Sequence, residues 1–292
     1  MSWLNHQSTA FWSTLYWTGF RGRLGGWRRE LFHVPTKRVP LGSLEGAVLR
    51  YGEICRRLLP WLESGPSLEG ARVCELGAGN CLATSALFLG LGARRVEVFE
   101  PLAPALDARQ REVLAALRAQ GLPLQPELLL PGDPPQFDPQ KMSWHRKLME
   151  DVDGASQFDL IFSFSVMEHV EALGAVLKVC HKALKPGGRM FHVVDLGGHD
   201  QFEDPMPPLD FQVYPDWVYS LMYPRYGRAT RQPVTEYVRH AKAAGFSQVS
   251  AEPIRVVDDA YLNAIWPKLN RRLRREDRET VRTIEFILAG TR

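Results

Sequence analysis

The sequence predicts an α/β protein built on a doubly wound, mostly parallel sheet of seven strands. Short apolar runs typical of buried strands alternate with segments whose apolar residues recur every three or four positions, the pattern of strand–helix units. The first such run, residues 71–76, ends in two glycines separated by one residue, and polar side chains follow several later runs. Because ligands of such sheets bind beyond the carboxyl ends of the strands, we expect one crevice there.

Composition limits the class of protein. The chain has 292 residues, 45% of them hydrophobic and 24% charged, which is typical of a globular protein able to bury a large core. A net charge of +3 is too small to indicate a nucleic-acid partner. The four cysteines form no C-x-x-C pair, so we expect buried, reduced thiols in a cytoplasmic protein. No long apolar run or basic leader indicates a membrane span or signal peptide.

The first 43 residues predict a separate cap, and residues 44–292 predict the main domain. Eight aromatic residues lie within residues 1–32, followed by a glycine-broken stretch rich in arginine. So many aromatics must bury against a surface. They can pack as a helical cap, close as a lid over an acceptor pocket or contact a membrane surface, and we favour the cap or lid over the membrane.

The elements before residue 121 follow from periodicity and capping residues. A helix is expected over Leu44–Leu62, with Ser43 as its cap and Pro60 marking its end. The strand at 71–76 precedes a helix over residues 82–89, for which Asn80 is the expected N-cap. Gly90 or Gly92 should stop that helix. A second strand (95–99) and a helix (105–120) complete this half.

The second half is partly ambiguous. The third strand can be residues 128–130 or residues 145–149, and the sequence does not decide between them. A strand over 158–165, a helix over 173–184, a sharp turn at 185–188 and a strand over 189–194 follow. An insertion at 197–232, rich in proline and aromatic residues, then comes before a helix (234–244), a strand (249–256), helical material (260–280) and a last strand (283–289).

The glycine turn and two carboxylates, Glu75 before the glycines and Glu100 after the second strand, predict a nucleoside site. Glycines allow a ligand to approach the backbone, and the following helix presents free N–H groups. Glu100 follows the second strand, where a carboxylate accepts hydrogen bonds from both hydroxyls of a ribose. Leu82 stands where dinucleotide-binding proteins have a third glycine, which favours a nucleoside without a pyrophosphate.

These residues resemble class I S-adenosylmethionine-dependent methyltransferases, particularly bacterial enzymes that act on small molecules. Glu75-Leu76-Gly77-Ala78-Gly79 is similar to the family's first motif and Glu100 to its ribose-binding acid. Phe158-Asp159-Leu160-Ile161 with Val166-Met167-Glu168-His169-Val170 resembles the fourth-strand motif, and Leu184–Arg189 resembles the turn before the fifth strand. The resemblance covers residues 44–289 and implies a Rossmann-like fold with S-adenosylmethionine as cofactor.

The resemblance also implies the cofactor-binding residues. Those that match the motifs are Glu75, Gly77, Ala78, Gly79, Glu100, Pro101, Ser165 and Val166. The acid that contacts adenine is not unique, because Asp133, Glu150 and Asp151 compete for this role. Ser163-Phe164-Ser165-Val166 replaces the Asn-Pro-Pro-Tyr motif of adenine and amide N-methyltransferases, which argues against those acceptors.

We therefore expect methyl transfer to a small organic acceptor, on an oxygen atom of a natural product or sugar. The base candidates are His199 first, then His169 and Asp195, whereas His192 should face the core. Aromatic residues of the insertion suit a ring-bearing or glycosidic acceptor. Apart from the loose group Asp195, His199 and Asp200, no cluster has metal-ligand spacing, so we expect no metal. Two rival interpretations are a nicotinamide-dependent oxidoreductase and a non-catalytic binding protein with the same fold.

Overall fold

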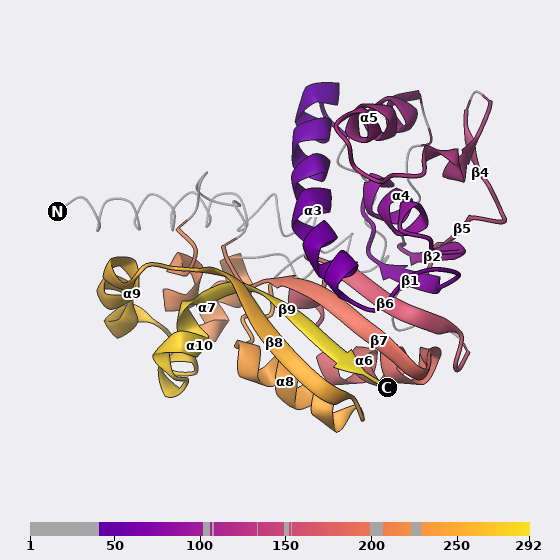
Figure 1. Ribbon diagram of the computed structural model, residues 1–292. Helices are drawn as coiled ribbons and strands as arrows, with labels where there is room; N and C mark the ends of the chain where they lie inside the picture. Colours follow the sequence, from indigo (N-terminus) through magenta and orange to yellow (C-terminus); the bar gives the residue numbers. More distant parts are fainter. Residues whose placement is uncertain are drawn as a thin grey trace.

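We describe the protein from a computed structural model (Figure 1). The residues that it describes are 41–101, 106, 108–132, 134–148, 152, 154–198, 207–222 and 229–292. The predicted N-terminal cap therefore lies outside the described residues, apart from residues 41–43. The same holds for His199 and for all three candidate adenine acids, Asp133, Glu150 and Asp151.

The described residues contain a seven-stranded sheet in the order β5-β2-β1-β6-β7-β9-β8. Its strands are β1 (Arg72–Leu76), β2 (Arg95–Phe99), β5 (Met142–His145), β6 (Phe158–Phe164), β7 (Leu184–Asp195), β8 (Ser247–Val256) and β9 (Thr283–Thr291). The pairs from β5 to β7 are parallel, and β9 is antiparallel to both β7 and β8. This confirms the predicted mostly parallel sheet. The strand order reverses between β1 and β6, where such sheets bind ligands.

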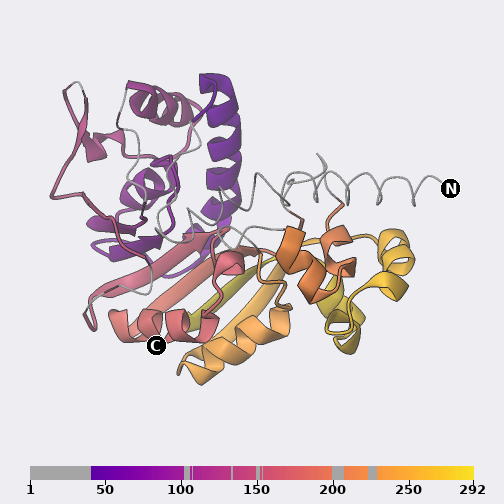
Figure 2. The same cartoon turned by 180° about the vertical axis from the view of Figure 1, so that it is seen from behind.

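Helices cover both faces of the sheet. On one face lie α3 (Leu44–Ser64), α4 (Ala83–Gly90) and α5 (Ala108–Ala119), and on the other α6 (Leu173–Ala183) and α8 (Val234–Ala243) (Figures 1 and 2). The central strands are buried on both sides because each face carries its own apolar cluster. Because these strands are buried on both faces, their sequences are continuous apolar runs.

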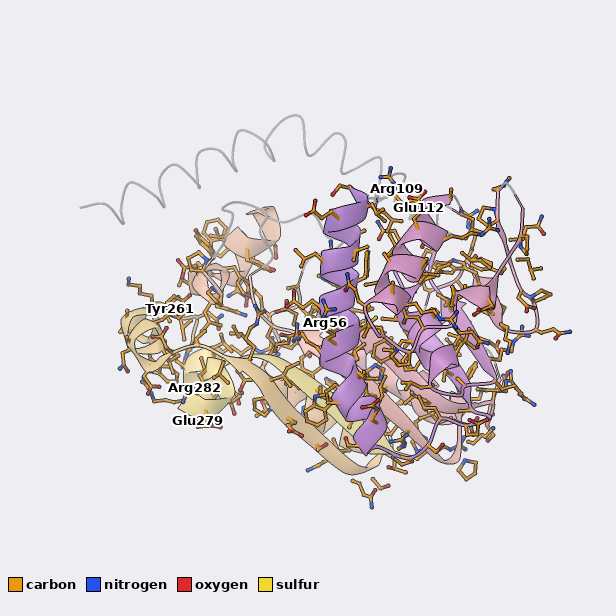
Figure 3. All side chains as sticks on the ribbon, turned by 45° about the horizontal axis from the view of Figure 1, so that its top comes forward. Arg56, Arg109, Glu112, Tyr261, Glu279 and Arg282 are labelled. Carbon is orange, nitrogen blue, oxygen red and sulfur yellow. The ribbon has the colours of Figure 1, made fainter. Side chains whose placement is uncertain are left out.

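Three short helices gather at one end of the sheet: α7 (Asp216–Met222), α9 (Asp259–Ile265) and α10 (Arg278–Arg282) (Figure 1). A separate apolar cluster joins the later two to the insertion after β7. Tyr261 of α9 fastens them, because its hydroxyl donates to Asp210 at 2.7 Å and accepts from the amide of Leu209 at 2.9 Å (Figure 3). Thus the insertion is packed structure in its described part.

Two predictions about helix ends were wrong. Helix α3 does not end at Pro60 but continues to Ser64, because Trp61 and Leu62 pack against the core and hold its last turn. Asn80 is not the N-cap of α4, which begins after Leu82 without a side-chain cap. Instead the Asn80 side chain accepts a hydrogen bond from the hydroxyl of Tyr51 at 2.5 Å, which ties α3 to the glycine turn.

Two further details differ in the second half. The third strand of the main sheet is β5, Met142–His145, which shares only His145 with one of the two candidates. Leu129–Leu130 forms β3 and pairs instead with Gln136–Phe137 (β4) in a small separate sheet. The expected turn at 185–188 lies inside β7 as an irregularity, where Gly187 has a φ of 77° and the register with β6 shifts.

Candidate functional site

The glycine turn lies between the carboxyl ends of β1 and β2. Gly77 and Gly79 have φ angles of 70° and 66°, a conformation that glycine adopts without steric cost. The Gly77 amide donates to the carbonyl of Phe99 at 3.0 Å. A Cβ on Gly77 would lie 2.5 Å from Cγ2 of Val166, whereas a Cβ on Gly79 would have no atom within 4 Å. The turn is thus closed toward β6 at Gly77 and open at Gly79.

Glu75, two residues before Gly77, links the strand before the turn to the helix after it. Its carboxyl group, only 2% exposed, accepts hydrogen bonds from the hydroxyls of Thr84 and Ser85 in the first turn of α4, the latter at 2.5 Å. Burial raises the pKa of Glu75 to about 7, and the two hydroxyls oppose this rise. Because both oxygens contact α4, the structure places Glu75 where it fixes the helix N-terminus relative to β1. Ala78, next to the glycines, packs against the same core.

Glu100 lies one residue past β2, on a fixed backbone. Its amide donates to the carbonyl of His145 at 3.1 Å, and its carbonyl accepts from Nε1 of Trp144 at 3.1 Å. The carbonyl of Pro101 accepts from Nε of Arg146 at 3.4 Å. The third strand therefore holds this segment in place, and the Glu100 side chain is half-buried at the same edge as the glycine turn.

The segment after β6 faces the glycine turn. Ser165 has a φ of 51°, which is uncommon for a residue other than glycine, and its amide donates to Val193 at 2.9 Å. Val166 contacts Gly77, and a short 3₁₀ turn over Met167–His169 follows. Nε2 of His169 lies 3.8 Å from Oε1 of Glu168, and the imidazole is partly exposed. The structure thus brings Gly77 and Val166 into contact and places His169 three residues further along.

Asp195 ends β7 within a cluster of charged residues that sequence reasoning missed. The charge cluster comprises Arg57, Asp195, Arg255 and Glu285. Nη2 of Arg255 lies 3.1 Å from Oδ1 of Asp195, and the amide of Gly197 donates to the same oxygen at 2.8 Å. The Glu285 carboxylate, 3% exposed, lies 2.6 Å from Nη2 of Arg57 and 3.4 Å from Nε of Arg255.

The only signal for this cluster in the sequence is one glutamate inside the apolar strand 283–289. A charge in a buried strand needs a partner, but the sequence does not say which arginine provides it. The cluster joins α3, β7, β8 and β9, and the guanidinium of Arg57 also lies 5.9 Å from the ring centroid of Phe164.

The structure also describes His192 and the four cysteines, which the sequence predicts to be buried. His192 is fully buried, contacts Ser163 at 2.9 Å through Nδ1, and has its pKa lowered to about 3 by burial, so the prediction of a core histidine is confirmed. All four cysteines are buried and free. Among the described residues, no group of three potential metal ligands occurs and no helix is long and apolar enough to cross a membrane.

Comparison with known proteins decides the family. A family model described as "Methyltransferase domain" matches residues 48–251, which is more than half of the chain. The chain belongs to this methyltransferase family. Membership of this family supports S-adenosylmethionine as the cofactor that the sequence motifs predict. Membership also sets aside the oxidoreductase interpretation.

The curated relatives of this methyltransferase are similar over part of their length. It is 32% identical over 133 residues to a "Ubiquinone biosynthesis O-methyltransferase" of Nitrosococcus oceani, covering 46% of this chain and 47% of that one. It is 24% identical over 132 residues to the protein of the same name from Pseudomonas aeruginosa, covering 45% and 47%. The chain thus spans about half the length of the curated relatives it matches.

A solved structure also resembles this methyltransferase. An S-adenosylmethionine-dependent methyltransferase from Mesorhizobium loti superposes with a TM-score of 0.46 at 18% identity, covering 86% of this chain and all of that one.

The residues of this methyltransferase fit its cofactor. A Cβ on Gly79 would have no atom within 4 Å, which leaves room for a ligand at the turn, and Glu100 follows β2, the strand paired with β1. When bound, S-adenosylmethionine supplies a methyl group on a positively charged sulfur.

Proposed function

We propose that the enzyme transfers a methyl group to an oxygen atom of a small organic acceptor that carries a ring, such as a phenol. The observation that carries this proposal is the juxtaposition of two sets of residues at one sheet edge. The glycine turn and Glu100 follow β1 and β2, while His169 and the charge cluster follow β6 and β7. The curated relatives are named as O-methyltransferases, which supports oxygen as the methylated atom.

In this proposal the cofactor contacts residues of β1, β2 and β6. Gly77, Ala78 and Gly79 face its amino-acid part, Glu100 accepts from the ribose hydroxyls, and Pro101, Ser165 and Val166 complete the wall. Glu75 acts indirectly, because its hydrogen bonds with Thr84 and Ser85 fix the position of the turn. Glu150 and Asp151, which lie outside the described residues, remain candidates for the adenine contact.

A base is needed to remove the hydroxyl proton of the acceptor. His169 is the favoured candidate among the described residues, because its imidazole is partly exposed at the sheet edge. Asp195 is less suited because Arg255 and the amide of Gly197 already occupy one of its carboxylate oxygens. His199, expected first from the sequence, remains a candidate outside the described residues.

The acceptor is tested with S-adenosylmethionine carrying a labelled methyl group. The enzyme is incubated with a panel of catechols, hydroxybenzoates, sugars, aromatic amines and thiols, and mass spectrometry locates the label. We expect label on a phenolic oxygen, and a rate loss on the order of 10²–10⁴ in the variant that lacks the true base, His169→Ala or His199→Ala. Label on nitrogen, sulfur or carbon would overturn the proposal.

The cofactor contact has its own test. Glu100→Ala removes a charged acceptor of hydrogen bonds, each worth roughly 1.5–3 kcal/mol, so the affinity for S-adenosylmethionine should fall about ten- to a hundredfold. Titration calorimetry measures this directly. Glu112→Ala on the exposed face of α5 is the matched control and should bind like the wild type (Figure 3). If Glu100→Ala binds S-adenosylmethionine as tightly as Glu112→Ala does, Glu100 does not contact the ribose.

A further inference from the structure

The short segment that follows the glycine turn, residues 80–82, is held by side chains from two helices elsewhere in the chain. Tyr51 lies on α3 and Gln110 lies in the first turn of α5. Both helices pack against α4 on one face of the sheet (Figure 1). Neither residue lies in the motifs that predict the cofactor site, and neither has a part in the proposed mechanism.

Gln110 is fully buried and contacts both ends of residues 80–82. Its Nε2 atom donates to the carbonyl of Asn80 at 2.7 Å, and its Oε1 atom accepts from the amide of Leu82 at 3.4 Å. The Leu82 amide precedes α4 and has no acceptor within that helix. A side chain of α5 therefore supplies an acceptor at the place where α4 begins.

Tyr51 contacts the side chain of Asn80, whereas Gln110 contacts its backbone. The hydroxyl of Tyr51 donates to Oδ1 of Asn80 at 2.5 Å. The guanidinium of Arg50 lies 5.8 Å from the ring centroid of Tyr51. Asn80 is thus bonded through its side chain to α3 and through its carbonyl to α5, immediately after the second glycine of the turn.

The glycine before Asn80 explains why these contacts matter for a ligand. Gly79 has a φ of 66°, and a Cβ there would have no atom within 4 Å. Glycine loses more conformational freedom than any other residue when its backbone is fixed. Hydrogen bonds that fix Asn80 restrict this freedom before a ligand arrives, so they lower the entropy that binding itself must remove.

We propose that Tyr51 and Gln110 are positioning residues for the cofactor, which act through Asn80 on the place where the amino-acid part of S-adenosylmethionine binds. The proposal rests on the proposed function, in which the glycine turn faces that part of the cofactor. The two side chains order the backbone after Gly79 in advance, and the ligand then binds to a turn that is already formed.

Two substitutions remove these contacts with little change in volume. Tyr51→Phe removes only the hydroxyl, and Gln110→Met replaces the amide with an apolar chain of similar length. Each should weaken the binding of S-adenosylhomocysteine about three- to tenfold in titration calorimetry. Tyr261→Phe, which also removes a hydrogen-bonded hydroxyl, and Gln120→Met at the exposed end of α5 are matched controls and should bind like the wild type. An equal loss in Tyr261→Phe would contradict the proposal.

A shorter ligand separates positioning from a general loosening of the site. 5′-Methylthioadenosine has the nucleoside and the sulfur of S-adenosylhomocysteine but lacks its amino-acid part. Tyr51→Phe and Gln110→Met should each weaken its binding less than about twofold, measured by displacement titration. An equal loss for both ligands would mean that the two side chains only stabilise the fold, and it would overturn the proposal.

The hydrogen bond of Tyr51 is isolated in the Asn80→Ala background, where the oxygen that accepts from the hydroxyl is missing. Tyr51→Phe should there cost less than about twofold in affinity, because its partner is already gone. Gln110→Met should still cost about three- to tenfold, because its partner is the backbone carbonyl. The same cost of Tyr51→Phe in both backgrounds would overturn its action through Asn80.

Hydrogen exchange of the ligand-free enzyme tests the proposal without cofactor or acceptor. Peptides that span residues 77–82 should exchange roughly threefold faster or more in Tyr51→Phe and Gln110→Met than in the wild type and the two controls. Unchanged exchange in both variants would show that other contacts order the turn, and it would overturn the proposal. If Gln110→Met does not fold, Tyr51→Phe alone decides each comparison.

The binding data separate the failure of this proposal from the failure of the proposed function. If the wild type binds S-adenosylhomocysteine but methylates none of the phenols, the proposed function fails, and the variants still decide the role of Tyr51 and Gln110. If the wild type methylates a phenol and both variants bind the ligand as tightly as it does, only this proposal fails. Absence of binding in the wild type would overturn the cofactor site and this proposal with it.

Discussion

The two sides of the proposed site are built in different ways. On the proposed cofactor side, two sets of contacts that shape the turn join neighbouring elements of the chain: Glu75 binds Thr84 and Ser85, and the Gly77 amide binds Phe99. On the proposed acceptor side, the charge cluster joins Arg57 to Glu285, which lie far apart in the chain. One side depends on backbone conformation, the other on ion pairs to a buried carboxylate, Glu285.

This difference explains what each half tolerates. Steric closeness at Gly77 leaves no room for a side chain, so the cofactor side should respond sharply to added volume. The acceptor side holds charges in pairs, so it should respond to the removal of one partner more than to a change of shape. Substitutions that separate volume from charge therefore test the comparison.

The largest effect is expected from Gly77→Ala. The new methyl group would lie 2.5 Å from Val166 and the residue would have to keep a positive φ, so we expect affinity for S-adenosylmethionine to fall by about a hundredfold. Calorimetric titration measures it. Gly70→Ala has the same φ of 70° with no atom within 4 Å, and controls for backbone strain alone. Recovery of at least tenfold in Gly77→Ala/Val166→Ala would assign the loss to this contact; no recovery would contradict it.

The same contrast decides how much was predictable from the sequence. The order of strands and helices, the glycine turn, Glu100 and the core position of His192 all follow from local patterns, and the structure confirms the sheet that they predict. The third strand was not located because Met142–His145 is short, and only Met142 in it is buried. β5 pairs with β2 in the folded chain, although the sequence of β5 has no apolar pattern that predicts a strand.

Helix ends and the charge cluster were missed for a related reason. Pro60 remains within α3 because packing of Trp61 outweighs the lost hydrogen bond, and Asn80 binds Tyr51 of a distant helix instead of capping its own. Likewise nothing near residue 285 in the sequence indicates Arg57. Contacts between residues far apart in the chain decide these features, and a single sequence does not reveal them.

A pH-dependent effect should separate Glu75 from the rest of the cofactor side. A carboxyl group whose pKa is raised to about 7 binds more protons in the folded state than in the unfolded state between pH 4.5 and 7. Its contribution to stability is therefore complete below about pH 4.5 and is lost as the pH rises through 7, a change of a few kcal/mol.

Glu75→Gln removes this titration, so between pH 5 and pH 8 the wild type should lose stability relative to the variant. Thermal unfolding at several pH values measures the two slopes. Glu112→Gln on the surface of α5 should keep the wild-type slope. Parallel slopes for the wild type and Glu75→Gln would show that burial does not raise the pKa of Glu75.

The smallest effects come from two ion pairs of similar length and different burial. Arg57→Ala leaves Glu285, which is 3% exposed, with Arg255 alone at 3.4 Å, and should cost about 1–3 kcal/mol of unfolding free energy. Arg118→Ala breaks a pair of 3.0 Å between residues that are 55% and 60% exposed, and should cost less than about 0.5 kcal/mol because water screens both charges.

Arg56→Ala, next to Arg57 on the exposed side of α3, controls for the helix itself (Figure 3). Urea unfolding of the three variants tests the order. Equal losses for Arg57 and Arg118 would mean that burial of Glu285 adds nothing to its ion pair, and the contrast between the two sides of the proposed site would then lose its physical basis.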